Sequence, residues 1–374
     1  MKQSEKVDSS IQSFNGLRFY FSLLIFLNHL VFLKKNGGGY YLFENFFHNG
    51  GFSVLFFFLL SGFCFALGYG DKFDSITKEN WLQFQIKRLN KIYPLYLVTM
   101  VVAIVLKTGK DILSGGSVVK ELAEGFVSIL WGATMTQAWI FTPYWGIGNS
   151  AAWFISSIFF LYLITPFLLK TISGLNGTRS LIALAVVAYI VSSAIILSWQ
   201  SAGWDETILY VTPWTRIPEF IIGICCGYIV KGYAANKQRV KNTVLEAVSV
   251  VLVVMVYSLV MVNGYNMTRT VDILATPILM FMIMVFAVSS GKISDILGNR
   301  VHRYLGSISM HIYLIHFVVI NDGGSQVLLK LFGTGNVGMA ITSILLFIIT
   351  FMLAVSWKSI EADKTSKAER AKLT

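Results

Sequence analysis

Arg18 and His29 are ionisable residues within one apolar segment, eleven positions apart. On an α-helix, eleven steps of about 100° return to within about 20° of the same face, and the rise separates the residues by about 16 Å. The guanidinium could hold a phosphate at an aqueous entrance, and a deeper neutral imidazole could take a proton from a hydroxyl. The pair suits a long anionic donor that reaches inward. Taken alone, the spacing is explained more simply by an Arg18 that snorkels and a His29 bonded to a neighbouring helix.

A second set of basic residues begins another apolar segment, in the sequence KRLNKIYPLY at 87–96. Arg88 and Lys91 are three residues apart, so a helix presents both on one side, where they could grip a phosphate. The alternative is that these positive charges only anchor the segment at the cytosolic surface.

Further ionisable residues lie inside other apolar segments, where such groups point to function by default. Arg216 and Glu219 are also three residues apart and are predicted to form a structural ion pair. His316, in the sequence YLIHF, is a second deep imidazole. A core histidine with satisfied hydrogen bonds is its simplest interpretation. His311 lies five residues earlier, on a different face of the helix.

Several motifs that carry chemistry in soluble enzymes are absent from the sequence. No HExxH, CxxC, paired-Asp or GxxxxGK[ST] pattern occurs, so no metal site, redox dithiol or P-loop is indicated. Ser61 is not a nucleophile elbow, because Leu59 stands where that motif needs a glycine, and we expect it to help helices pack. The three cysteines all lie in apolar runs and are expected to be small core residues: Cys64, Cys225 and Cys226.

The composition places these residues in a membrane protein. Of the 374 residues, 55% are hydrophobic and only 13% are charged, about half the charged share of soluble domains. A helix needs about 20 mostly apolar residues to cross a bilayer. We therefore predict an all-α bundle of about ten transmembrane helices, at 14–33, 50–69, 92–107, 151–172, 180–199, 213–231, 243–262, 271–290, 303–321 and 337–357. The segment 118–140 contains two glutamates and is assigned to a loop, with an interfacial or re-entrant helix as the alternative.

The net charge of +11 is spread in short basic clusters between the apolar runs. That distribution is typical of topogenic signals, and it excludes a nucleic-acid partner. Most of these clusters gather on one side of the membrane, so both termini are predicted to be cytosolic. The segment 1–13 shows no signal peptide and is expected to be a cytosolic tail. The segment 14–357 then forms one membrane domain, and the basic tail 358–374 lies near anionic lipid headgroups.

Six motifs, in order along nearly the whole chain, resemble those of the acyltransferase family 3 membrane proteins. The first contains the Arg-x10-His pair, the second ends in SGF, and the third is similar to the family's RIYP segment. The six stretches are FNGLRFYFSLLIFLNHL (14–30), GGFSVLFFFLLSGF (50–63), KRLNKIYPLY (87–96), AAWFISSIFFLYLITP (151–166), RIPEFIIGICCG (216–227) and YLGSISMHIYLIH (304–316). Each motif is weak alone, and their order makes the resemblance specific.

The resemblance implies an enzyme that takes an acyl group, most often acetyl, from cytosolic acetyl-CoA. It implies as acceptor a hydroxyl of a cell-envelope saccharide such as O-antigen, exopolysaccharide or a lipid-linked glycan, at the bacterial inner membrane. It also implies that His29 is the catalytic histidine, as general base or as transient acyl carrier, and that Arg18 is its essential partner. We expect both side chains to face one shared cavity, and no metal ion is expected.

The resemblance also suggests how CoA is held. Arg18 and Arg88 are expected to bind its phosphates together with Arg303, and Lys91 stands where the family usually has a second arginine, which keeps the charge but weakens bidentate binding. The further site candidates are Ser61, Tyr93, Trp153, Arg216, Glu219 and His316. The long outer connection 107–150 carries Trp131, Trp139 and Trp145, which could stack on a sugar or form an interfacial belt.

One departure keeps two alternatives open. Many relatives carry a WSLSVE-type motif in the fourth span, but WFISSI (153–158) places Ile158 at about the position of its glutamate. Any role of that carboxylate cannot be transferred. The alternatives are a transporter or flippase for lipid-linked glycans, and an assembly subunit that has lost the chemistry.

Overall fold

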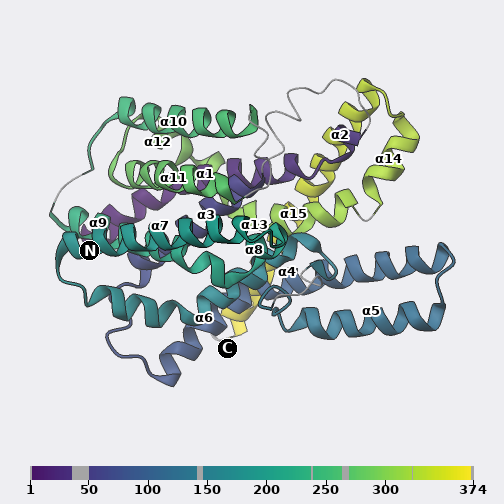
Figure 1. Ribbon diagram of the computed structural model, residues 1–374, viewed down its shortest axis with the longest axis horizontal. Coiled ribbons are helices and arrows are strands. Elements are labelled where there is room, and N and C mark those ends of the chain that lie inside the picture. Colours follow the sequence, from purple (N-terminus) through teal and green to yellow (C-terminus); the bar gives the residue numbers. More distant parts are fainter. Residues whose placement is uncertain are drawn as a thin grey trace.

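Helices account for almost all of the regular structure in the computed structural model, which describes residues 2–35, 50–140, 146–236, 239–262, 269–321 and 323–371. They lie side by side in one bundle, most of them along its long axis (Figure 1). In chain order the α-helices are α1 Lys2–Asn28, α2 Phe32–Lys35, α3 Gly50–Tyr69, α4 Lys78–Leu113, α5 Val118–Ala133, α6 Trp153–Ser173, α7 Gly177–Ser201, α8 Glu206–Val211, α9 Ile217–Asn236, α10 Thr243–Val262, α11 Thr270–Val288, α12 Lys292–Leu297, α13 Arg300–Asn321, α14 Gly324–Phe332 and α15 Asn336–Ala371. Short 3-10 turns lead into α6 and α9, at Ser150–Ala152 and Pro213–Arg216.

The predicted all-helical membrane fold is confirmed. Within the described ranges, nine helices are long and apolar enough to cross a membrane, and each overlaps one of the predicted segments. The first predicted segment, 14–33, is too long, because α1 ends at Asn28 and the chain turns there. The number of spans and the sides on which the termini lie stay predictions.

The third predicted segment, 92–107, is much too short. Helix α4 runs over 36 residues because a capping box between Thr77 and Asn80 starts it well before the apolar run, satisfying backbone donors that would otherwise stay unpaired. Pro94 lies inside α4 without ending it. Arg88 and Lys91 are therefore in the middle of a continuous helix and not at its first turn.

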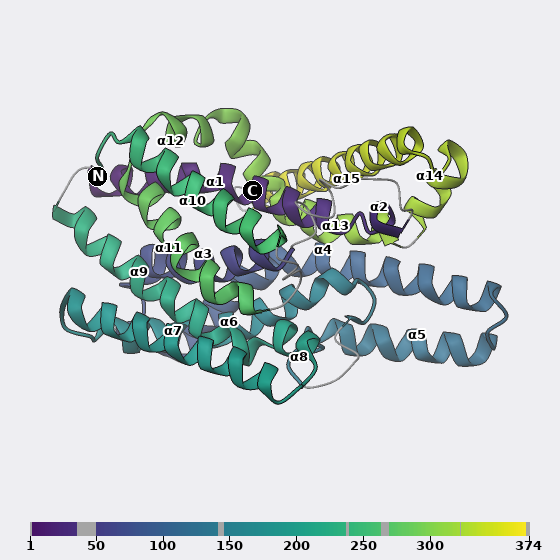
Figure 2. The same cartoon turned by 45° about the horizontal axis from the view of Figure 1, so that its top comes forward.

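Segment 118–140 is largely helical rather than a loop. Helix α5 packs back along the second half of α4, and the two form a hairpin that projects from the bundle in both ribbon views (Figures 1 and 2). The hydroxyl groups of Tyr93 and Tyr96 donate hydrogen bonds to the carbonyl oxygens of Ala133 and Gly132, at 2.9 and 2.6 Å. Helix α5 thus returns from the tip of α4 to about half of its length, and whether it is interfacial or re-entrant stays a prediction.

Glycines allow the closest helix contact in the bundle, between α3 and α9. A Cβ at Gly62 would overlap the carbonyl oxygen of Phe220, and a Cβ at Gly223 would overlap that of Leu59. Such close backbone approach by small residues is typical of packing between membrane helices. The conspicuous SGF motif therefore places its glycine, and not Ser61, at this interface.

Helices α1 and α13 run in the same direction and carry the residues of the site. Gly306 of α13 lies directly against the backbone of Asn15, where any Cβ would collide with it. Farther along, the imidazoles of His29 and His316 are in contact. Close packing between the middle of α1 and the first turns of α13 thus brings two distant histidines together.

Candidate active site

His29 and His316 form a hydrogen-bonded pair. The Nε2 atom of His316 lies 3.2 Å from Nδ1 of His29, which is also 2.8 Å from the carbonyl oxygen of Ile25. The Nδ1 atom of His316 lies 2.6 Å from the carbonyl oxygen of Tyr313. A carbonyl oxygen only accepts, so each Nδ1 carries a proton, and in the neutral ring Nε2 then carries the lone pair. His316 Nε2 accepts from His29, and the basic nitrogen of His29 is its Nε2.

The backbone at the end of α1 explains the position of His29. His29 is the first residue after the helix, and its amide still donates to the carbonyl oxygen of Phe26 at 3.1 Å. The ring of Phe317 packs edge-on to the imidazole, 5.4 Å between centroids. His29 is therefore held by its backbone, by a ring and by a second imidazole, as a catalytic base requires.

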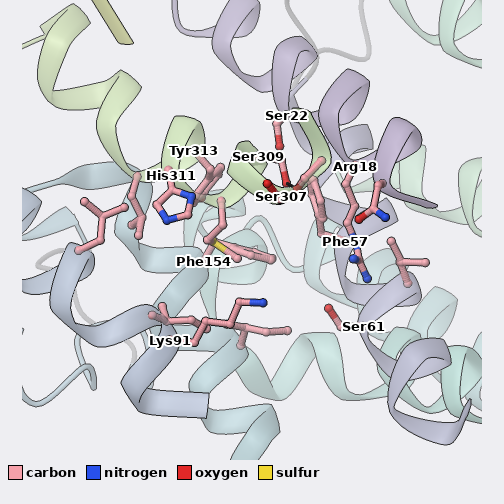
Figure 3. Close-up of a pocket in the computed structure, with 18 of the residues that line it drawn as sticks. Arg18, Ser22, Phe57, Ser61, Lys91, Phe154, Ser307, Ser309, His311 and Tyr313 are labelled. Carbon is pink, nitrogen blue, oxygen red and sulfur yellow. Dashed lines mark hydrogen bonds between the residues drawn. The ribbon is translucent and has the colours of Figure 1, made fainter. Parts of the chain in front are cut away.

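Basic side chains gather in a cavity of about 320 Å³, which we call the inner cavity. Arg18 from α1, Arg88 and Lys91 from α4, and Lys358 from α15 all line it. Figure 3 shows Arg18 and Lys91 approaching it from opposite sides, with Ser61 nearby. The prediction that Arg88 and Lys91 face the same way is confirmed, and none of the described residues that line this cavity is acidic.

The guanidinium of Arg88 is held on a platform of three aromatic rings. It lies 4.9 Å from the centroid of Phe65, 4.8 Å from Tyr69 and 5.4 Å from Phe84. Arg18 instead donates from Nη2 to the sulfur of Cys64 at 3.4 Å. Neither arginine makes an ion pair among the described residues, so both keep their charge available for an anion.

His29 lines a second cavity, of about 540 Å³, which we call the outer cavity. Its wall is largely apolar and aromatic and includes Trp153 and Tyr210, whose rings are 4.8 Å apart. Burial raises the pKa of the Tyr210 phenol, although Arg216 nearby acts to lower it. Tyr210 thus stays protonated. Trp153, a candidate from the sequence, lines the same cavity as His29.

The expectation that Arg18 and His29 face one cavity is wrong. The two cavities are distinct and share a single described residue, Tyr313. Its hydroxyl donates to the carbonyl oxygen of Ala151 at 2.5 Å, and its ring lies 5.4 Å from that of Phe154. Spacing on α1 could not show this, because the separating ring comes from α13. The site is therefore a track of two compartments that meet at Tyr313.

Other candidates take different places. Arg303, expected to bind CoA, is exposed and does not line the inner cavity. Tyr93 bonds to the end of α5 and lines neither cavity. Ser61 and Ile158 both line the inner cavity. Trp145 lies outside the described residues.

The predicted ion pair between Arg216 and Glu219 is also wrong in its partners. Arg216 pairs with Asp272 at 2.8 Å, while Arg269 pairs with Glu219 and, at 2.9 Å, with Asp272. All four side chains are buried. Arg269 lies between two apolar runs of the sequence, and nothing in its local spacing shows that it pairs with Glu219 and Asp272.

This network holds helix α8, which forms one wall of the outer cavity. Arg216 donates to the carbonyl oxygen of Tyr210 through Nε at 3.1 Å and Nη2 at 2.9 Å. Arg269 donates to the carbonyl oxygen of Leu209 at 3.3 Å. The guanidinium groups thus pair the carbonyl oxygen of Tyr210 and share that of Leu209 with the hydroxyl of Thr215, near the end of a six-residue helix whose last backbone acceptors have no partner within the helix.

Sequence reasoning missed several residues that line the cavities, among them Lys358, Asn28 and Glu206. Lys358 was assigned to the cytosolic tail, yet it lines the inner cavity. Asn28 and Glu206 line the outer cavity with His29. Asn28 directly precedes His29 and could have been suspected for that reason, whereas no local pattern distinguishes Glu206.

The comparisons with known proteins agree on one family. The family 3 acyltransferase domain matches residues 11–358. The chain is 28% identical to acyltransferase MdmB of Streptomyces mycarofaciens over 335 residues, covering 84% of the chain and 80% of that protein. It is 23% identical to nose resistant to fluoxetine protein 6 of Caenorhabditis elegans over 385 residues, 85% of the chain and 46% of that protein. No solved structure matches. With the paired imidazoles and the cationic cavity, the match shows that this chain belongs to the family 3 acyltransferases and is a multi-pass membrane acyltransferase.

Proposed function

We propose that this acyltransferase moves an acetyl or other short acyl group from acetyl-CoA to a hydroxyl of a cell-envelope saccharide, at the bacterial inner membrane. The observation that carries the proposal is the position of His29. Its basic nitrogen belongs to a cavity that meets, at Tyr313, a second cavity rich in cations. A donor with a charged head and a long neutral arm fits such a track.

The inner cavity suits the nucleotide end of acetyl-CoA. Its four basic side chains and its serine hydroxyls are hydrogen-bond donors, which match the oxygens of a diphosphate and a 3′-phosphate. Arg18 and Arg88 supply planar guanidinium groups that can bind in a bidentate manner, and Lys91 and Lys358 act as point charges. The pantetheine arm then extends past Tyr313 toward His29.

The outer cavity suits the transfer itself. The acceptor hydroxyl gives its proton to Nε2 of His29, and its oxygen attacks the thioester carbonyl carbon. The carbon–sulfur bond breaks, the ester forms, and the thiolate of CoA takes the proton from the imidazolium. His316 accepts from Nδ1 of His29 throughout, which keeps Nε2 directed at the reaction. No cluster of metal-binding side chains is found among the described residues, and the step as written uses only the imidazole.

Purified protein in liposomes tests this proposal. With labelled acetyl-CoA we expect thiol release and labelled glycan, and His29→Ala should abolish both while the protein elutes and melts as the wild type does. His302→Ala is the matched control, because His302 is partly exposed and bonds to Tyr20, outside both cavities. Glycan movement without any donor would instead indicate a transporter, and full activity of His29→Ala would refute the proposed chemistry.

A further inference from the structure

Two buried oxygen atoms beside His29 have no hydrogen-bond donor among the described residues. They are Oδ1 of Asn28 and Oε2 of Glu206, and both residues line the outer cavity. The Asn28 side chain is only 6% exposed and lies against Gly50, where a Cβ would come within 2.8 Å of Nδ2. Buried acceptors are nearly always paired in folded proteins. This pair of unsatisfied oxygens therefore points to donors supplied by a ligand.

The position of Glu206 is built into the fold. The side chain of Asp205 accepts a hydrogen bond from the amide of Thr207 at 2.7 Å, and Trp199 donates to the carbonyl oxygen of Asp205 at 3.0 Å. The buried ion network holds the other end of α8. The short helix α8 is thus held at both ends. Glu206 is its first residue, so its carboxylate is not a mobile surface charge.

The two cavities have opposite hydrogen-bonding character. The inner cavity offers cations and hydroxyl groups. The outer cavity offers acceptors, namely Oδ1 of Asn28 and the carboxylate of Glu206, beside His29 and among apolar and aromatic walls. A carboxylate repels phosphates and other carboxylates but binds hydroxyl donors well. The complement of this wall is a neutral ring with several adjacent hydroxyls on one edge and C–H groups on its face.

We infer that the outer cavity is a subsite for a neutral polyol, in which Asn28 and Glu206 accept hydrogen bonds from the hydroxyls that flank the reacting one. This inference rests on the proposed function, because it assigns the acceptor side of the same reaction. Asn28 and Glu206 are specificity residues, since they touch the acceptor but no bond that breaks. The subsite also excludes acidic sugars, because these would bring a second negative charge next to Glu206.

Alkyl glycosides provide the test, with the full chain in liposomes and labelled acetyl-CoA. The acceptors are an alkyl glucoside, the matching alkyl glucuronide and a simple alcohol of the same alkyl length. We expect the wild type to acetylate the glucoside and to reject the other two. Glu206→Gln keeps the shape of the side chain but removes its charge. It should therefore reduce the difference in acetylation rate between the glucuronide and the glucoside. Its KM for the glucoside should rise about tenfold, the loss expected for one charge-assisted hydrogen bond.

Further variants separate specificity from structure. Asn28→Ala should raise the KM for the glucoside and Asn28→Asp should restore it in part, because Asp retains an acceptor oxygen. Glu79→Gln, an exposed residue in the first turn of α4, is the control. All variants should still bind acetyl-CoA and cleave it slowly in water through His29.

The outcomes distinguish the two ideas. If thiol release does not depend on His29, the proposed function fails. The polyol subsite alone is overturned if release depends on His29 but the glucoside is not acetylated, if the simple alcohol serves as well as the glucoside, or if Glu206→Gln and Asn28→Ala leave the KM and the preference unchanged.

Discussion

The imidazole of His316 lies 3.2 Å from that of His29, nitrogen to nitrogen, although 287 positions separate them in the chain. Each Nδ1 lies next to a carbonyl oxygen and therefore carries a proton. In the contact between the rings, His29 donates and His316 accepts. His316 is buried and touches neither the inner cavity nor its cations. In the mechanism proposed above, this relationship makes His316 a positioning residue that acts on the reaction through His29.

Loss of His316 should slow catalysis without weakening donor binding. His316→Ala removes the acceptor that orients His29, and a misplaced base costs about 100-fold in kcat. Gln can offer an oxygen near the position of Nε2, so His316→Gln should recover part of the rate. Kinetics in liposomes would measure kcat, its pH profile and the KM for acetyl-CoA. An unchanged pH profile together with an unchanged kcat would contradict this role.

The aromatic platform predicts that Arg88 cannot be exchanged for lysine. Arg88→Lys keeps the charge but loses both the planar fork and most of the stacking on Phe65, Tyr69 and Phe84. The KM for acetyl-CoA should rise about tenfold, the effect of about 1.4 kcal/mol, with little change in kcat. Arg303→Lys is the matched control because Arg303 is exposed outside the cavity. Equal effects of the two substitutions on the KM for acetyl-CoA would show that Arg88 does not bind the donor.

Tyr313 is predicted to keep water from the thioester. It is the residue common to both cavities and is itself buried. Tyr313→Ala should join the cavities, so hydrolysis of acetyl-CoA should rise several-fold relative to transfer to an acceptor. Tyr313→Phe retains the ring and loses only the hydrogen bond to Ala151, so its ratio should stay close to that of the wild type. The ratio is read from total thiol release and labelled acceptor, and a ratio unaffected by the loss of the ring would argue against a barrier.

The residues that sequence predicted well are those whose signal is local. Apolar length located the helices, and the three-residue spacing put Arg88 and Lys91 on one side of α4, as the structure confirms. The two cavities could not be predicted, because Tyr313, the residue at which they meet, belongs to a helix almost 300 residues away in sequence. The partners of Arg216 depend in the same way on where α11 packs. Glu206 shows the limit most clearly, since only the packing of α8 brings its carboxylate to the cavity of His29.

The buried ion network predicts a stability effect that is separate from catalysis. Asp272 contacts both Arg216 and Arg269, so Asp272→Ala leaves two buried guanidinium groups short of a partner and should cost about 3–5 kcal/mol. Removing a whole pair is milder, because no uncompensated charge remains: Arg216→Met with Asp272→Leu leaves the pair of Arg269 with Glu219 in place. The double variant should therefore melt at a higher temperature than Asp272→Ala in detergent. A double variant that melts below the single one would show that Arg216 holds α8 mainly through its bonds to Tyr210, and not through balanced charge.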